Sequence, residues 1–197
     1  MYCVLFAAVQ VDLGFLVEGS TNVLEPEFVQ YMEIVKYICS AFPISAENVR
    51  VGLGVISSNP EIVFSFDKYF DKKSLESAVN GVEYPGIQQV ANIGQSLLVA
   101  KDTFYGKGAR KGVRKVLIVL ANGKSNDQIS DPARRLRDSG VEIFCFAVGS
   151  RVDVQELTEI ATHPISNHMV TESDGLTNGA KKLIELLEVA KVESGNL

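Results

Sequence analysis

Apolar residues along the chain follow two patterns, and each pattern predicts a different element. Short continuous apolar runs that end in polar turn residues are typical of strands buried on both faces of a sheet. Longer segments between them carry apolar residues at helical spacing. The predicted strands are 12–17, 49–56, 61–66, 115–120 and 141–149, and the predicted helices are 25–39, 74–82, 93–105, 131–139, 153–161 and 175–189.

This alternation predicts an α/β fold with a doubly wound, mostly parallel sheet and helices on both faces. The runs 49–56 and 61–66 are the exception, because they flank a tight polar turn and read as a hairpin that adds one antiparallel edge strand. We therefore expect a single domain over residues 1–197, with its core at about 11–190. Core side chains on the later strands are expected to include Leu117, Val119, Phe144 and Phe146. On the helix at 131–139, we expect Arg134, Arg135 and Arg137 to be exposed.

Composition and charge narrow the functional classes. The 197 residues are 46% hydrophobic and 22% charged, and a chain of this length buries about 70% of its unfolded surface without a metal or disulfide framework. The net charge of −5 argues against nucleic acid as a partner. No apolar run approaches the length needed to cross a bilayer. The apolar opening 1–9 lacks a basic leader region, so we interpret it as the lead-in to the first strand rather than a signal-peptide remnant.

The cysteines and histidines are too sparse for a metal or redox motif. No Cys-x-x-Cys pair occurs, and Cys39 and Cys145 lie inside apolar runs, where free cysteine behaves as a small buried hydrophobe. Cys3 is left open to pairing outside the chain. His163 and His168 are the only histidines, whereas zinc normally takes three or four nitrogen or sulfur ligands. We interpret His163, which precedes a proline, as a turn residue.

Three polar loops, 18–22, 88–94 and 121–125, are predicted to meet at one edge of the sheet. Ligands of open α/β sheets bind at the carboxyl ends of the strands, near the point where the strand order reverses. The phosphate-binding glycine motifs and the nucleophile elbow are both absent from the sequence. The edge is therefore the expected site, and it lacks the usual motifs of nucleotide or acyl chemistry.

Four ordered blocks of this sequence resemble those of von Willebrand factor A domains. Val11–Ser20 looks like the family's first strand and metal loop, and Lys115–Ser125 looks like its central strand. Gly140–Gly149 and Glu159–Pro164 resemble the later blocks. The resemblance extends over nearly the whole chain and is strongest to matrix members such as the type VI collagen, matrilin and cochlin domains. It implies a secreted, extracellular protein-interaction module used in cell adhesion, not an enzyme.

The resemblance also implies where a cation site would lie. The family's metal-ion-dependent adhesion site is Asp-x-Ser-x-Ser followed by a Thr and an Asp, and it holds Mg²⁺. Here these positions fall on Glu18, Ser20, Asn22, Ala91 and Asn122, so only the first serine is retained. Mg²⁺ demands near-ideal oxygen geometry and one or two carboxylates. We therefore expect this degenerate site, at most Glu18, Ser20 and Asn22, to bind Mg²⁺ or Ca²⁺ weakly or not at all, and we expect no other cofactor.

The expected partner is an extracellular-matrix protein, bound at this edge or on the helical flanks if the edge has become inert. A run of basic residues is interpreted as a solvated loop, with an anionic partner such as a glycosaminoglycan as the alternative. Its members are Lys107, Arg110, Lys111, Arg114 and Lys115.

Two other functional classes stay open. One is a Rossmann-like enzyme at the same strand ends, which needs a general base, and Glu18 is the only plausible proton acceptor there. The other is a purely structural domain with no ligand of its own. The identity of the partner is not readable from the sequence.

Overall fold

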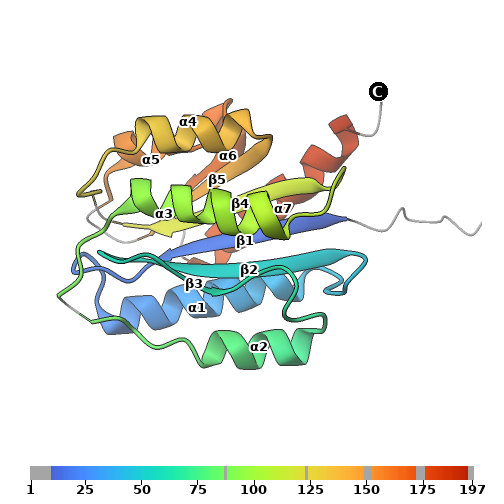
Figure 1. Cartoon of the computed structure of the whole chain (residues 1–197), viewed down its shortest axis with the longest axis horizontal. Helices are drawn as coiled ribbons and strands as arrows, with labels where there is room; N and C mark the ends of the chain where they lie inside the picture. The colour runs from blue at the N-terminus through green and yellow to red at the C-terminus, as the bar shows by residue number, and fades with distance from the viewer. Residues whose placement is uncertain (1–9, 87, 123, 149–151, 172–175, 195–197) are drawn as a thin grey trace, which may run out of the picture.

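A six-stranded sheet of order β3-β2-β1-β4-β5-β6 runs through the middle of the molecule (Figure 1). The computed structural model describes residues 10–86, 88–122, 124–148, 152–171 and 176–194. Residues 1–9, including Cys3, lie outside these ranges, so the expectations for them stay predictions. The strands are β1 Val11–Glu18, β2 Val49–Ile56, β3 Glu61–Phe64, β4 Arg114–Ala121, β5 Val141–Ala147 and β6 Met169–Thr171.

The predicted sheet is confirmed, with one strand added. All pairings are parallel except that of β2 with the edge strand β3, which is antiparallel as the hairpin predicted. The prediction missed β6, because three residues are too few to show a strand pattern. It also extended β3 two residues too far, since the paired strand ends at Phe64.

Helices cover both faces of the sheet (Figure 1). Those on one face are α1 Glu25–Ser40, α2 Lys72–Asn80 and α7 Leu176–Ser194. Those on the other are α3 Ile93–Ala100, its π-helical continuation η1 Lys101–Gly108, α4 Ser130–Asp138 and α5 Val154–Ile160. A short helix that was not predicted, α6 Ile165–His168, precedes β6. No helix in the described ranges is both long enough and apolar enough to span a bilayer.

Alternation along the strands divides the core into two layers. Leu13, Phe15 and Val17 of β1 pack with α1, α2 and α7, whereas Leu16 packs toward α3 and α4. Each of these side chains is at most 2% exposed. Strands that carry apolar residues at successive positions are thus buried on both faces, as their continuous apolar runs predicted.

Glycines let η1 approach the sheet. Gly14 and Gly52 are partners in the register of β1 and β2. A Cβ at Gly52 would lie 2.8 Å from Cε1 of Phe104, and one at Gly14 would lie 2.6 Å from the hydroxyl of Tyr105. The sequence predicted a single helix at 93–105. In the structure the α-helix ends at Ala100 and continues as a π-helix, in which Phe104 and Tyr105 are both buried.

Both described cysteines are buried and free, as predicted. Burial raises the pKa of the Cys39 thiol to about 12, and it raises the pKa of Cys145 as well. The thiolate is the reactive form of cysteine, so neither side chain is activated.

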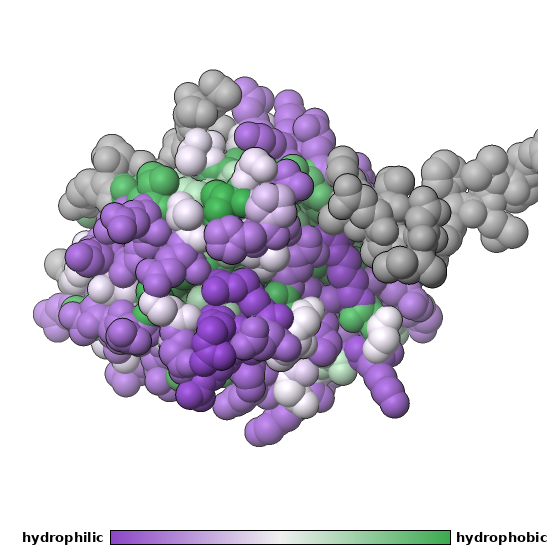
Figure 2. Space-filling view, turned by 90° about the horizontal axis from the view of Figure 1, so that it is seen from above, coloured by the Kyte–Doolittle hydropathy of each residue, from purple (hydrophilic) through white to green (hydrophobic). Residues whose placement is uncertain are grey.

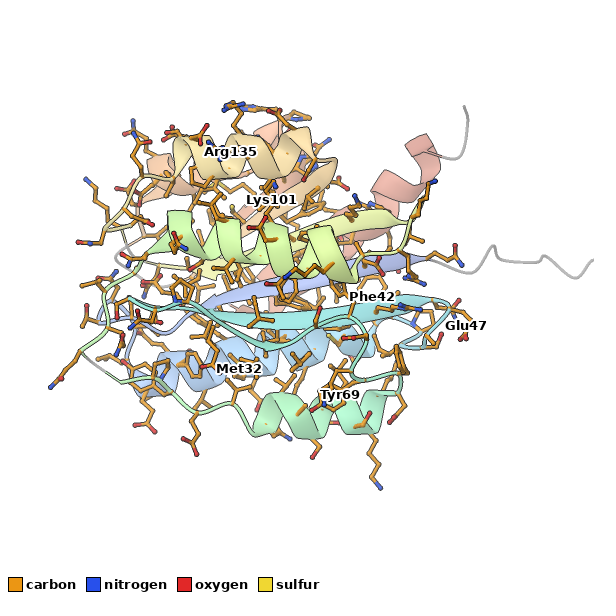
Figure 3. The ribbon with its side chains drawn as sticks, viewed as in Figure 1. Met32, Phe42, Glu47, Tyr69, Lys101 and Arg135 are labelled. Carbon is orange, nitrogen blue, oxygen red and sulfur yellow. The ribbon has the colours of Figure 1, made fainter. Side chains whose placement is uncertain are left out.

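The basic face of α4 differs from the prediction at one residue. Arg134 and Arg135 are exposed and form ion pairs with Asp131; Figure 3 labels Arg135 on α4. Arg137 is only partly exposed, because it donates to the carbonyl oxygens of Glu159 (2.9 Å) and Ile160 (2.7 Å). These carbonyls at the end of α5 would otherwise lack partners. The prediction that Arg137 is exposed was therefore wrong.

Replacing Phe146 by alanine is expected to lower the free energy of unfolding by about 3–5 kcal/mol, the usual range for emptying an aromatic core site. Phe146 is fully buried, and its ring lies against α7, where a Cβ at Gly179 would come within 2.5 Å of Cζ. Urea titration measures the effect, with the 52% exposed Val29→Ala on α1 as the control. A loss below about 1 kcal/mol would contradict the packing described here.

Candidate functional site

The three predicted loops do meet at the carboxyl ends of the strands, on the left of Figure 1. The backbone N–H of Thr21 donates to the carbonyl oxygen of Gln89 (2.6 Å), which joins the first loop to the loop before α3. The N–H of Asn126 donates to the carbonyl oxygen of Ala91 (2.7 Å), which joins that loop to the one after β4. We refer to this edge, formed by residues 18–22, 88–94, 121–122 and 124–127, as the strand-end site.

Glu18, the last residue of β1, is fully buried at the centre of this site. Its Oε1 accepts hydrogen bonds from Oγ of Ser20 (2.6 Å) and Nδ2 of Asn22 (3.0 Å), and its Oε2 accepts one from the backbone N–H of Asn122 (2.8 Å). A buried carboxylate is costly unless its oxygens are satisfied. Here neutral donors from two loops satisfy both oxygens.

The loop after β1 closes on itself around the same contacts. Ser20 is fully buried, and its hydroxyl oxygen also accepts from the backbone N–H of Asn22 (3.1 Å). The hydroxyl hydrogen therefore points to Glu18 and a lone pair points to Asn22. Such side-chain to backbone bonds fix the geometry of a turn. The retained serine is thus used inside the loop.

The two remaining family positions contribute little to a ligand set. Ala91 is 2% exposed, and its methyl group belongs to the apolar cluster beneath α3. Asn122 is also 2% exposed, and no described residue donates to its Oδ1. It is a buried amide oxygen without a donor among the described residues.

The five family positions offer few of the oxygen ligands that Mg²⁺ takes in proteins. Asn22 turns its amide nitrogen rather than its oxygen toward Glu18, and Ala91 has no side-chain oxygen. Both oxygens of Glu18 already accept hydrogen bonds in this arrangement. Within the described ranges, no group of three His, Cys, Asp or Glu side chains is placed to hold a metal ion.

Two further acids shape the site and were missed in the sequence. Asp127 accepts from the backbone N–H groups of Gly94 (2.8 Å) and Gln95 (2.7 Å), so it caps α3 from a different loop. Glu156 of α5 accepts from the N–H of Ser125 (2.7 Å), and burial raises its pKa above the usual range. Local capping patterns could not reveal either contact, because each joins segments about thirty residues apart.

The basic run lies at the opposite end of the sheet, and two of its five members point inward. The Arg110 guanidinium binds the fully buried Asp12 (Nε to Oδ1, 2.8 Å) and donates to the carbonyl oxygen of Glu47 (2.6 Å). Figure 3 labels Glu47 at this opposite end of the sheet. Arg114 binds Glu142 (2.6 Å between Nη2 and Oε2). Lys107 and Lys111 are exposed and Lys115 is partly buried. The run is therefore only partly a solvated loop, because its arginines have acidic partners far away in the sequence.

Arg114 belongs to a cluster that also holds His168. His168 is 7% exposed, with Nε2 2.9 Å from Oε1 of Glu142 and Nδ1 3.0 Å from the carbonyl oxygen of Pro164. Both neighbours accept hydrogen bonds, so only the doubly protonated ring satisfies both. Burial by itself lowers the pKa of His168, but the bonds to Glu142 and Pro164 raise it above the usual range. His163, by contrast, is exposed.

This fold, with its site at the carboxyl ends of the central strands, defines a Rossmann-like binding domain, and sequence comparison gives the family. The model of the von Willebrand factor type A domain matches residues 12–184. The chain belongs to this family.

Its relatives include the matrix-type members expected from the sequence. Matrilin-1 of Gallus gallus is 33% identical over 176 residues, which cover 87% of this chain and 35% of matrilin-1. The collagen alpha-1(XII) chain of Notophthalmus viridescens is 31% identical over 180 residues, which cover 89% of this chain and 19% of the collagen chain. The chain thus spans about a third or less of these relatives.

Solved structures show the same fold. One is proximal thread matrix protein 1 from the mussel byssus with a zinc-occupied MIDAS motif. It superposes with a TM-score of 0.80 at 21% identity, and the match covers 93% of this chain and 48% of that protein's chain. Manganese-loaded TRAP of Plasmodium vivax superposes with a TM-score of 0.77 at 14% identity, and the match covers 90% of this chain and 73% of the TRAP chain. At these identities the likeness establishes the fold alone.

Replacing Glu18 by glutamine is expected to lower the free energy of unfolding by about 1–3 kcal/mol, the cost of leaving buried partners unsatisfied. Both oxygens of Glu18 accept hydrogen bonds, so the NH₂ group of glutamine must face a donor. Urea titration at pH 7 measures the loss. Glu61→Gln, at an exposed position, is the control and should stay within about 0.5 kcal/mol of the unmodified protein. Equal stability of the two variants would contradict the hydrogen-bond network.

The stability of the protein is expected to fall as pH rises through the raised pKa of His168. A histidine whose pKa is higher in the folded state stabilises fully below its unfolded pKa of about 6.5, and this contribution is lost above the folded pKa. Unfolding free energies measured between about pH 5.5 and 8.5 should decline less in His168→Gln than in the unmodified protein. His163→Gln, which changes the exposed histidine, should keep the original pH dependence.

Proposed function

We propose that this chain is a non-enzymatic protein-interaction module of the extracellular-matrix type, and that its strand-end site works without a bound cation. The observation that carries the second part is the closed set of hydrogen bonds around Glu18. Identity of 31–33% to matrilin-1 and a collagen chain supports the first part. The same relatives support an extracellular location.

The arrangement supports binding rather than catalysis. A general base must offer a free lone pair to the proton that it removes. Glu18 is fully buried, and hydrogen-bond donors engage both of its oxygens. The Rossmann-like enzyme considered from the sequence therefore gains no support from this site.

A cation-free site also changes which groups a partner can contact. Glu18 and Ser20 are fully buried, so recognition at this edge would use the exposed side chains around them, such as Thr21, Gln88 and Lys124. A partner carboxylate that completes a metal's coordination has no counterpart here. Binding should consequently be insensitive to chelators.

Addition of Mg²⁺ to about 1 mM, the weak end of protein affinities for divalent cations, is expected to leave the melting temperature unchanged. Occupancy would stabilise the fold by mass action, about 2.7 kcal/mol at a hundredfold excess over the Kd. The matched variant is the combination Glu18→Asp, Asn22→Ser, Ala91→Thr and Asn122→Asp, which restores every family ligand and should gain a Mg²⁺-dependent rise. Micromolar Mg²⁺ binding to the unmodified protein in calorimetry would overturn the cation-free site.

The interaction function itself is tested by capture from an extract of extracellular matrix on the immobilised chain. The same matrix protein should be recovered in EDTA and in Mg²⁺. Recovery in Mg²⁺ alone would contradict cation independence, and recovery of no matrix protein under either condition would contradict the module itself.

A further inference from the structure

Two neighbouring hollows lie on the side of the sheet covered by α1 and α2. The first, of about 460 Å³, is bounded by the β2–β3 hairpin and by the segment 81–85, which follows α2. The second, of about 430 Å³, lies between the same segment and α1. Val82 and Glu83 line both, so one stretch of chain separates the two hollows.

The charged residues that line the hollows are all acidic. Glu61 and Glu83 line the first hollow, and Glu25, Glu33 and Glu83 line the second, with no lysine, arginine or histidine in either lining. Glu33 pairs with Lys36 (2.7 Å), which also donates to Asn80. Within the described ranges, Glu25, Glu61 and Glu83 form no ion pair. Negative charge is therefore left uncompensated at this surface.

A neighbouring tyrosine responds to that charge. Tyr84 lines the second hollow, and its hydroxyl donates to the carbonyl oxygen of Val23 (2.7 Å). Burial, followed by the charges of Glu25 and Glu27, raises its pKa. The α4 side of the molecule is also rich in charge, and Figure 2 shows it as mostly hydrophilic, but there Arg134 is paired with an acid of its own helix.

Part of the wall of each hollow is apolar. Val63, which is 39% exposed, lines the first hollow together with Val55. Val29, which is 52% exposed, lines the second together with Met32, which Figure 3 labels on α1. Each hollow thus combines an apolar wall with a carboxylate that has no ion-pair partner among the described residues.

We propose that the two hollows bind successive arginine side chains of an extended, basic segment of a partner protein. Arginine lays an apolar stem along apolar surface while its guanidinium pairs with a carboxylate through two parallel hydrogen bonds. Glu83 stands between the two hollows and can pair with either side chain. The proposal rests on the proposed function in treating the chain as a protein-binding module. The first hollow adjoins the strand-end site, because Gln89 lines it, but Glu25, Glu61 and Glu83 lie outside that site.

The test uses a fluorescent ten-residue peptide with arginine at alternate positions and glycine or serine between them. Fluorescence anisotropy measures its Kd for the full chain at low and physiological salt. Glu83→Gln is expected to weaken binding about tenfold, as befits a hydrogen bond between charged groups. Glu25→Gln and Glu61→Gln each alter one hollow and should weaken peptide binding less than Glu83→Gln does.

Matched controls separate this site from general attraction to an acidic domain. Glu47→Gln makes the same change of charge at the opposite end of the sheet (Figure 3) and should leave the Kd unchanged. A peptide with glutamine in place of arginine should not bind. Equal weakening by Glu47→Gln and Glu83→Gln, or the absence of measurable binding by the unmodified chain, would overturn the proposal.

Two further arms complete the test. If Ca²⁺ raised the melting temperature and Glu83→Gln abolished the rise, the hollows would be a cation site and the proposal would be wrong. Val63→Ser removes part of the apolar wall of the first hollow. This change should weaken binding of the arginine peptide more than binding of a peptide in which 2,3-diaminopropionate replaces arginine, because that side chain lacks the long stem. None of these outcomes depends on the capture experiment from matrix, so the two proposals fail independently.

Discussion

The burial of the Glu18 carboxylate at the end of β1 is the constraint on which the strand-end site depends. A carboxylate removed from water must be met by a cation or by hydrogen-bond donors. Here Ser20, Asn22 and the backbone of Asn122 provide the donors, and two of the three loops are held together by doing so. These hydrogen bonds therefore also shape the edge.

The same strand carries a second buried acid, satisfied in a different way. Asp12, near the start of β1, is fully buried and accepts from the backbone N–H of Arg110 (2.6 Å) as well as from its guanidinium. That guanidinium also reaches the carbonyl oxygens of Glu47 and Asn48. One end of β1 is thus closed by an ion pair and the other by neutral donors. Both carboxylates are fully buried.

The sequence predicted the layers of the fold well, because continuous apolar runs and helical spacing are local signals of burial. It also predicted that Glu18, Asn22 and Asn122 lie at one edge of the sheet, because parallel strands place their carboxyl ends together. It did not predict β6, the π-helical turn or the cap on α3 by Asp127. These depend on contacts between segments far apart in the chain. The two inward arginines were missed for the same reason: a basic residue in a loop carries no local sign of a buried partner.

The two proposals together imply a change in the charge that this domain prefers in a partner. A bound cation at the strand ends attracts an acidic group, but the buried Glu18 surrounded by donors offers no positive charge to attract one. Glu25, Glu61 and Glu83 form no ion pair among the described residues and add negative charge beside this edge. Electrostatic complementarity governs encounter rate and specificity more than total affinity. A domain built in this way would select basic segments by charge and hold them by the apolar walls of the hollows, and its binding would weaken with salt rather than with chelator.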